Sequence, residues 1–135
     1  MKVPGSDLMP KMKERLLGVL MAAALLSVGC QDRTIAKSLQ GRWIRPDGGY
    51  VLEIKGVAAD GRLDAAYFNP RPIHVAEARA SQNGVTINVV IVLSDENYPG
   101  STYNLVYDPL SDKLRGDYYQ AVAQEHYQIF FERMK

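Results

Sequence analysis

The sequence predicts an all-β domain over residues 39–135, a small eight-stranded antiparallel up-and-down barrel, preceded by a helical N-terminal segment. Three observations predict it. Apolar and polar residues alternate with a period of two over much of this region, as in strands with one buried face. Turn signals such as Asn83-Gly84 recur about every 8–12 residues, the spacing of a sandwich or barrel. No helical pattern of useful length follows Cys30, and short connections favour strands that pair in sequence order.

The turn signals delimit the strands. The first expected strand surrounds Trp43 and stops at Pro46-Asp47-Gly48-Gly49. Asn69-Pro70-Arg71-Pro72 ends the third, and a polar loop over 95–101 follows the fifth. That fifth strand is the most β-branched run, with one face expected to carry Val85, Ile87, Val89, Ile91 and Leu93. The eight predicted strands cover residues 41–45, 50–55, 62–67, 73–80, 85–93, 102–107, 113–120 and 126–134.

Eight such strands can close into a barrel, whose interior is either filled by side chains or holds one small ligand. Closure also removes the exposed strand edges that an all-β domain otherwise has to protect. The sequence therefore favours a barrel over an open sheet.

The N-terminal segment has the pattern of an export signal. Lys11, Lys13 and Arg15 precede an uncharged apolar run over 16–28. This run is shorter than the roughly 20 residues that a membrane-spanning helix needs, and it is typical of the core of a signal peptide. Residues 1–10 add nothing to such a signal, so Met12 is an alternative start.

Leu26-Ser27-Val28-Gly29-Cys30 resembles the lipobox of bacterial lipoproteins. Gly29 fits that pattern, whereas Ser27 stands where leucine is most frequent. The resemblance implies cleavage before Cys30 and attachment of palmitate-type acyl chains to it, which gives stable membrane attachment. The alternatives are an ordinary signal with a coincidental cysteine, or an uncleaved anchor.

The resemblance divides the chain into a signal peptide (1–29), a lipidated tether (30–38) and the barrel domain (39–135). The polar residues 31–38 either form a simple tether or a helical turn over one barrel end. Gln31 follows the cysteine where an aspartate often signals retention at the inner membrane. In a Gram-negative host the resemblance therefore implies an outer-membrane lipoprotein facing the periplasm.

Leu39-Gln40-Gly41-Arg42-Trp43 resembles the start of lipocalin- and avidin-type (calycin-like) barrels, in which the indole of a Gly-x-Trp motif plugs one barrel end. The segments 65–74 and 97–103 are similar to a family of uncharacterised bacterial lipoproteins. The first resemblance implies a fold, and the second implies no activity.

Charge and cysteine content exclude some classes of function. From Cys30 onward, 12 Lys and Arg face 13 Asp and Glu, so the domain is close to neutral. Nucleic-acid binding needs clustered basic residues, and we expect none. With one cysteine no intrachain disulfide is possible, so stability has to come from burial.

The sequence carries no pattern typical of an enzyme. His74 and His126 have no partners at metal-ligand spacing, so no metal or cofactor is expected. Asp95 and Glu96 are adjacent and would point to opposite faces of a strand. No serine lies in a Gly-x-Ser-x-Gly elbow, and lipidation would consume the thiol of Cys30.

Aromatic residues give the best candidates for a binding site, because tyrosine combines apolar bulk with a polar tip. The alternative is that they are strand formers and core residues. Two prolines bracket Arg71 and would fix its direction, and the expected strand order places its loop at the same end as Tyr98. The candidate ligand-binding residues are Trp43, Tyr67, Arg71, Tyr98, Tyr103 and Tyr118.

Two functions are therefore expected, both non-enzymatic. The first is a protein-binding or envelope-associated module with a solid interior, and the alternative is a barrel that binds a small apolar ligand. The volume of the interior distinguishes them, because a ligand site needs a cavity of about 300 Å³ or more.

Overall fold

A computed structural model describes residues 33–135. The expected signal peptide and Cys30 lie outside the described residues. The residues from Thr34 to Lys135 form one compact unit. Within the described part of the chain, no helix is both long and apolar enough to cross a membrane.

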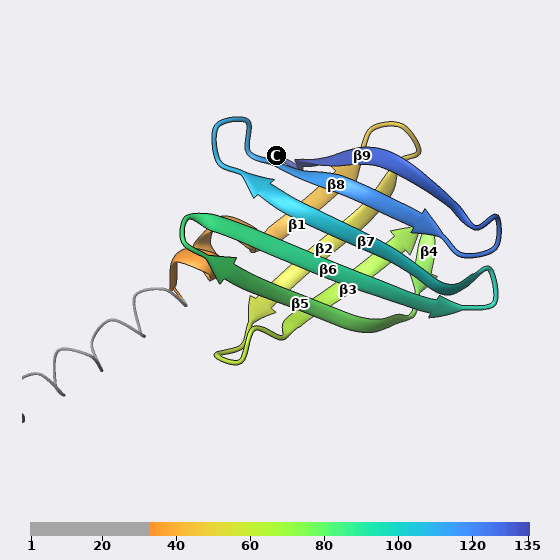
Figure 1. The fold of residues 1–135 in the computed structure, drawn as a ribbon, viewed down its shortest axis with the longest axis horizontal. Coiled ribbons are helices and arrows are strands. Elements are labelled where there is room, and N and C mark those ends of the chain that lie inside the picture. The colour runs from red at the N-terminus through yellow and green to blue at the C-terminus, as the bar shows by residue number, and fades with distance from the viewer. Residues whose placement is uncertain (1–32) are drawn as a thin grey trace, which may run out of the picture. The chain divides into compact units, whose positions relative to one another are not determined.

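The domain is all-β, and its strands form one antiparallel sheet (Figure 1). The predicted fold class is confirmed to this extent. In sequence order the strands are β1 (Gly41–Arg45), β2 (Tyr50–Val57), β3 (Leu63–Asn69), β4 (Arg71–Ile73), β5 (Val75–Asn83), β6 (Thr86–Asp95), β7 (Tyr98–Asp108), β8 (Lys113–Gln120) and β9 (Glu125–Arg133).

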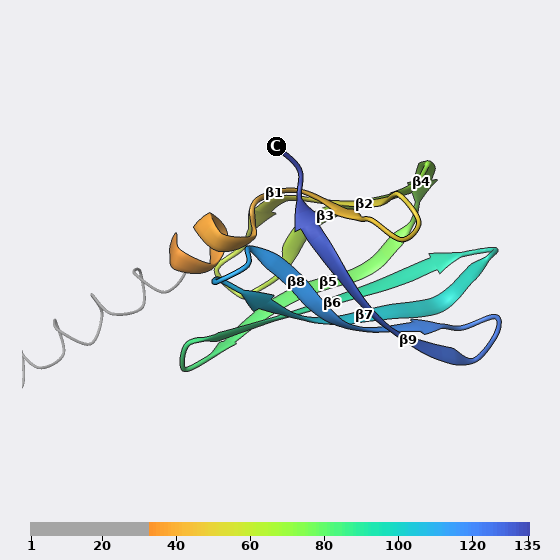
Figure 2. The ribbon, with the colours of Figure 1, turned by 90° about the horizontal axis from the view of Figure 1, so that it is seen from above.

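The sheet curls into a nearly closed barrel. Its strand order is β4-β3-β2-β1-β9-β8-β7-β6-β5, so neighbours in sequence pair throughout, except that β1 pairs with β9 and β4 does not pair with β5. Across this remaining gap, the Arg62–Arg79 bridge and a 2.8 Å hydrogen bond from the Ala80 amide to the Gly61 carbonyl join the two sides. In Figure 2, β1–β4 lie on one side, β5–β8 on the other, and β9 crosses between them.

Nine strands are present where eight were predicted, because the expected strand over 73–80 is divided. Arg71–Ile73 folds back onto β3, with Pro72 opposite Phe68, and β5 begins only at Val75. Proline is tolerated here because β4 is an edge strand, where no ladder hydrogen bond is lost. The predicted loop over 95–101 was also wrong: β7 already starts at Tyr98, and only two residues separate it from the end of β6 at Asp95.

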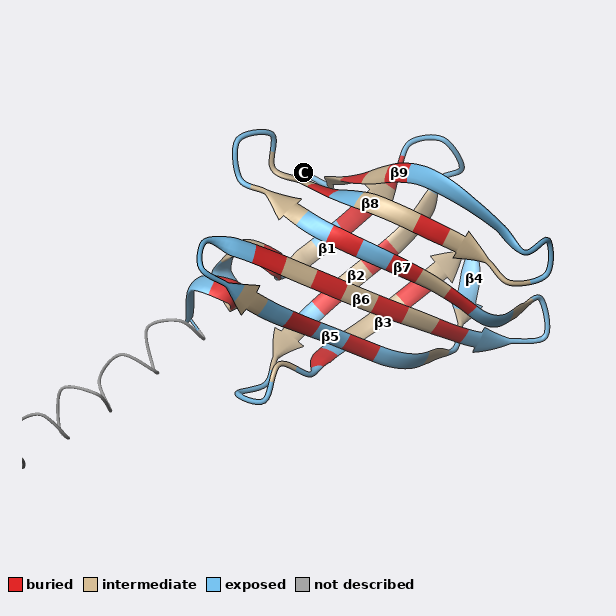
Figure 3. Ribbon diagram, in the orientation of Figure 1, coloured by how far each residue is buried: buried red, intermediate tan, exposed pale blue. Residues whose placement is uncertain are grey.

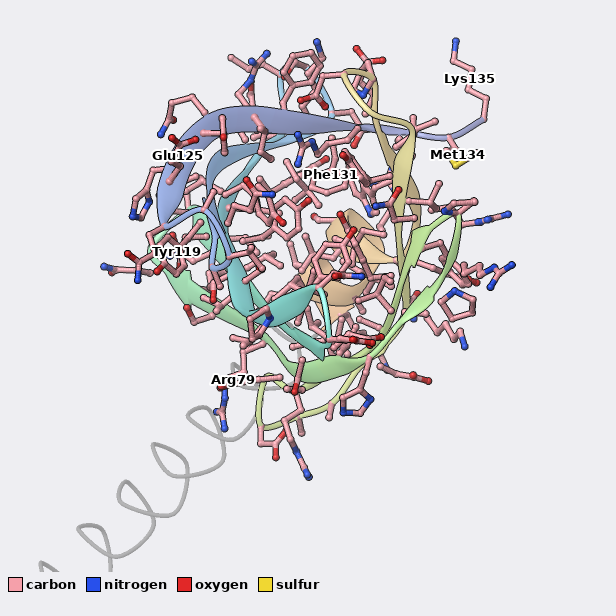
Figure 4. All side chains as sticks on the ribbon, turned by 90° about the vertical axis from the view of Figure 1, so that its right-hand side faces the viewer. Arg79, Tyr119, Glu125, Phe131, Met134 and Lys135 are labelled. Atoms are coloured by element: carbon pink, nitrogen blue, oxygen red, sulfur yellow. The ribbon has the colours of Figure 1, made fainter. Side chains whose placement is uncertain are left out.

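The core follows the predicted alternation. On β6, Ile87, Val89, Ile91 and Leu93 are buried, and the other residues of the strand are more exposed (Figure 3). The exception is Val85, which precedes the strand and is 96% exposed. Fully buried aromatic and aliphatic side chains fill the barrel, and Figure 4 shows Phe131 inside the ring of strands.

One end of the barrel is closed by a helix over residues 33–39, which we call the helix end. Ile35 and Leu39 are buried in the core, and the indole nitrogen of Trp43 donates a 2.9 Å hydrogen bond to the Leu39 carbonyl. The guanidinium of Arg133 lies 4.1 Å from the centre of the Trp43 ring. Residues 34–38, which were expected in the tether, thus belong to the compact unit. They are helical, which was the alternative expectation for this segment.

Candidate binding site

A pocket of about 390 Å³ opens at the end opposite the helix, which we call the open end. The β1–β2, β6–β7 and β8–β9 turns surround it, on the right of Figure 1 and facing the viewer in Figure 4. Its lining is mostly aromatic and polar: Arg45, Asp47, Tyr50, Asn97, Tyr98, Tyr118, Gln120 and Tyr127.

Arg45 is the buried charge of this pocket. It is the last residue of β1 and lies two positions after Trp43, so the pleat of the strand points both side chains inward. Only 7% of Arg45 is exposed. Its Nη1 donates a 2.9 Å hydrogen bond to the hydroxyl of Tyr103. A guanidinium this deeply buried has to be paired, because an unpaired buried charge is very costly.

Asp47 neutralises Arg45 from the β1–β2 turn. Nε and Nη2 of Arg45 donate to its two carboxylate oxygens at 2.7 and 2.6 Å, a bidentate pair. These hydrogen bonds hold the pKa of Asp47 below its ordinary value. Burial alone would lower the pKa of Arg45, but its bonds to Asp47 and Tyr103 outweigh burial and raise it. The side chain of Asp47 is 55% exposed, so the pair links the buried guanidinium to solvent.

A hydrogen-bonded pair of tyrosines continues from Arg45 into the barrel. The hydroxyls of Tyr67 and Tyr103 lie 2.7 Å apart. Burial raises the pKa of Tyr103 to about 12 and raises that of Tyr67 further. Both hydroxyls therefore stay protonated at neutral pH, and the network carries one positive and one negative charge, those of Arg45 and Asp47.

Tyrosine rings form the walls around the guanidinium. The guanidinium carbon of Arg45 lies 4.6 Å from the ring centre of Tyr50 and 5.2 Å from that of Tyr118. Tyr103 stacks on Tyr118 with a centroid separation of 4.4 Å. These contacts fix the direction of Arg45, because guanidinium groups pack well against aromatic faces.

The pocket is thus a recess over a filled barrel. Trp43, Tyr67, Tyr103 and Phe131 are fully buried and occupy the interior. The free volume lies above them, where aromatic faces, amide groups and the Arg45–Asp47 pair meet solvent. Such a surface can hold one amphipathic group by stacking and hydrogen bonding.

Four of the six candidate residues meet at this end. Tyr98 and Tyr118 line the pocket, whereas Tyr67 and Tyr103 lie beneath it in the filled interior. Tyr98 contacts Tyr67 with a centroid separation of 6.4 Å. The amide of Asn69 donates to the hydroxyl of Tyr98, so the β3–β4 and β6–β7 turns lie at one end, as the strand order predicted.

The other two candidates do not line the pocket. Trp43 points toward the helix end, where its ring contacts Tyr107 edge-on and lies beneath Arg133. Arg71 is exposed on β4 and does not line the pocket. Its turn does lie at the open end, as predicted, because Asn69, the ladder partner of Arg71, bonds to Tyr98.

Sequence reasoning missed Arg45, Asp47 and Tyr50. Period-two alternation from the buried Trp43 would have identified Arg45 as inward-facing. A charged residue at a strand end is ordinarily exposed, however, and this expectation outweighed the pattern.

The remaining polar candidates do not form a second site of this kind. His126 pairs with Asp117 at 2.7 Å, with the imidazole side chain 64% exposed. No group of three or more metal-ligating side chains occurs between residues 33 and 135. A second cleft, of about 520 Å³, follows the gap between β3 and β5 and is lined partly by Arg62, Asp64, Glu77 and Arg79.

Comparison with known proteins yields no relative: no family model matches the chain, and no curated protein or solved structure is significantly similar to it.

Proposed function

We propose that this chain is a lipid-anchored, non-enzymatic binding module of the bacterial cell envelope, whose open-end pocket receives a segment of a protein partner. The observation that carries the proposal is the arrangement of the barrel. Its interior is filled, while its open end presents a recess of about 390 Å³ lined by tyrosine, arginine and amide side chains.

The chemistry of the recess favours a protein partner. Tyrosine and arginine are enriched at the energetic centres of protein interfaces, because they bury a large surface and keep a polar group for hydrogen bonding. Tyr50, Tyr98, Tyr118 and Tyr127 supply that surface. Tyr118 stacks on Tyr127, Tyr50 and Tyr98 contact the buried ring of Tyr67, and Arg45 lies over Tyr50 and Tyr118. These contacts reduce the conformational entropy that binding would cost.

The anchor is supported by the sequence alone, through the basic start, the apolar run and Gly29-Cys30. The chain enters the barrel through the helix over 33–39, at the end opposite the pocket. A lipid on Cys30 would therefore attach the helix end to the membrane and leave the pocket accessible from the periplasm. An outer-membrane location remains part of the proposal.

The second candidate is a lipocalin- or avidin-like barrel that binds a small apolar ligand. The pocket volume favours it, since about 390 Å³ lies within the range of small-molecule sites. Against it, Trp43, Tyr67 and Phe131 fill the interior that such a ligand would occupy.

Site-specific photo-crosslinking in the native cell tests the proposal. A photoreactive residue at Asn97 or Gln120, both in the pocket lining, is expected to give the same discrete protein adduct. A probe at Leu110, 98% exposed in the turn between β7 and β8 near the helix end, is the control and should not give this adduct. Equal adducts from all three positions, or none from the pocket, would contradict a protein-binding role at this end.

A further inference from the structure

We infer that the group recognised in the open-end pocket is a carboxylate, which binds Arg45 by replacing Asp47. The inference rests on the proposed binding role of this pocket and names the chemistry of the bound group. In this view Asp47 is an internal ligand that occupies the site until a partner's carboxylate displaces it.

The guanidinium of Arg45 is held more firmly than the carboxylate of Asp47. Arg45 is held by the Tyr103 hydroxyl and by the rings of Tyr50 and Tyr118, all on strands. The side chain of Asp47 is 55% exposed, and the Arg45 side chain is 8% exposed. Arg45 is therefore a preformed half-site, and its carboxylate partner sits on the solvent side.

The β1–β2 turn has the glycines that would let Asp47 move away from Arg45. Gly48 and Gly49 follow it, and Gly49 has a positive φ of 71°. A Cβ on Gly48 would lie 2.0 Å from the ring of Tyr50, so a side chain there would disturb the pocket wall. Glycine leaves the turn conformational freedom at the position where Asp47 would swing outward.

The buried charge of Arg45 makes the site selective for an anionic group. If Asp47 leaves, Arg45 becomes a buried cation without a counterion, which is strongly unfavourable. A group that restores two parallel hydrogen bonds and the negative charge compensates, and the carboxylate of Asp47 shows that the site fits this group. A neutral amide cannot supply the charge. The aromatic walls then accommodate an apolar side chain attached next to the carboxylate.

Calorimetric titration of the full chain in detergent tests this, with three blocked dipeptides as probes. Acetyl-glycyl-phenylalanine offers a terminal carboxylate, its C-terminal amide offers none, and acetyl-aspartyl-phenylalanine amide offers a side-chain carboxylate. We expect the Asp47→Asn variant to bind a carboxylate peptide at least about tenfold more tightly than the unmodified chain, because the internal competitor is gone. The tighter of the two carboxylate peptides identifies the source of the group.

Asp60→Asn is the matched control, since Asp60 is also a turn aspartate paired with an arginine, Arg62, at 2.8 Å. It should leave binding unchanged. Arg45→Lys keeps the charge but loses the bidentate geometry, and should remove the gain when combined with Asp47→Asn. As a readout independent of heat signals, the carboxylate peptide should raise the unfolding temperature of Asp47→Asn more than the amide does.

Two results would overturn the inference: equal binding of the amide and the acids, or equal affinities of Asp47→Asn and the unmodified chain. Either result, together with persistent crosslinks at Asn97 and Gln120, would remove the carboxylate and keep the proposed partner-binding role. Carboxylate binding without crosslinks would keep the carboxylate site and contradict the proposed protein partner.

Discussion

Replacement of Tyr103 by phenylalanine tests the buried network that supports the pocket. The change removes one oxygen and leaves the ring that packs on Tyr118 and Phe131. That oxygen accepts a 2.9 Å hydrogen bond from Arg45 and shares a 2.7 Å hydrogen bond with Tyr67. Its loss leaves a charged donor and a neutral hydroxyl without a partner inside the barrel.

The expected cost follows from these two bonds. A hydrogen bond to a charged group contributes about 1.5–3 kcal/mol and a neutral one about 0.5–1.5 kcal/mol. Tyr103→Phe should therefore lower the free energy of unfolding by about 2–4.5 kcal/mol. Tyr67→Phe breaks only the neutral bond, because the Tyr103 hydroxyl still accepts from Arg45, and should cost about 0.5–1.5 kcal/mol.

Urea unfolding of residues 33–135 at pH 7, followed by the fluorescence of Trp43, measures both values. The double variant should cost less than the sum of the single variants, because both replacements remove the same hydrogen bond. The reasoning is refuted if Tyr67→Phe costs as much as Tyr103→Phe, or if the two costs are simply additive.

Three further predictions concern the pH dependence, the packing and the anchor. The hydrogen bonds from Arg45 depress the pKa of Asp47, so the ionised carboxylate contributes to stability above its ordinary pKa near 3.8, and this contribution is lost as the pH falls through the lowered pKa. Urea unfolding at pH 7 and pH 3 should therefore show that Asp47→Asn destabilises the protein less at pH 3. An equal loss of stability at both pH values would contradict this prediction. Gly116→Ala would place a Cβ 2.0 Å from the Asn104 carbonyl oxygen and should lower the free energy of unfolding by about 1–3 kcal/mol. Gly56→Ala is the control, because a Cβ there has nothing within 4 Å and should be tolerated. Equal unfolding midpoints of the two variants would contradict this prediction. Cys30→Ser should abolish acylation and release the chain from the membrane fraction, and retention there with unchanged processing would exclude the lipoprotein assignment.

The sequence could predict the strands that alternate and their arrangement in a barrel-like sheet, which is nearly closed. On β6, alternation alone identified four buried residues, because a β-branched strand with one apolar face has one stable orientation. It could not predict β4, since three residues that include Pro72 have the composition of a loop. Likewise Pro99-Gly100 has the signature of a turn, yet it lies within β7, where Gly100 adopts a φ of 89°.

The site was predictable only in part. The aromatic content indicated that tyrosines would gather, and Tyr67, Tyr98, Tyr103 and Tyr118 do lie together. The central charge was not predicted, because a buried arginine is rare and its burial depends on Asp47 two residues later. Partners of this kind are set by the path of the turn, which composition does not determine.

The position of β9 has a consequence for the order in which the chain can fold. In the described barrel, β9 alone joins β1–β4 to β5–β8 through ladder pairing, with Arg133 opposite Trp43 and the Met134 amide bonded to the Arg42 carbonyl at 2.8 Å. A chain still emerging from the ribosome has both halves of the wall but not the strand that unites them. Completion of the barrel therefore waits for residues about 90 positions after β1, a long-range closure that is slow to form. If the protein is exported, the two halves of the wall are joined by this ladder only after β9 has been made.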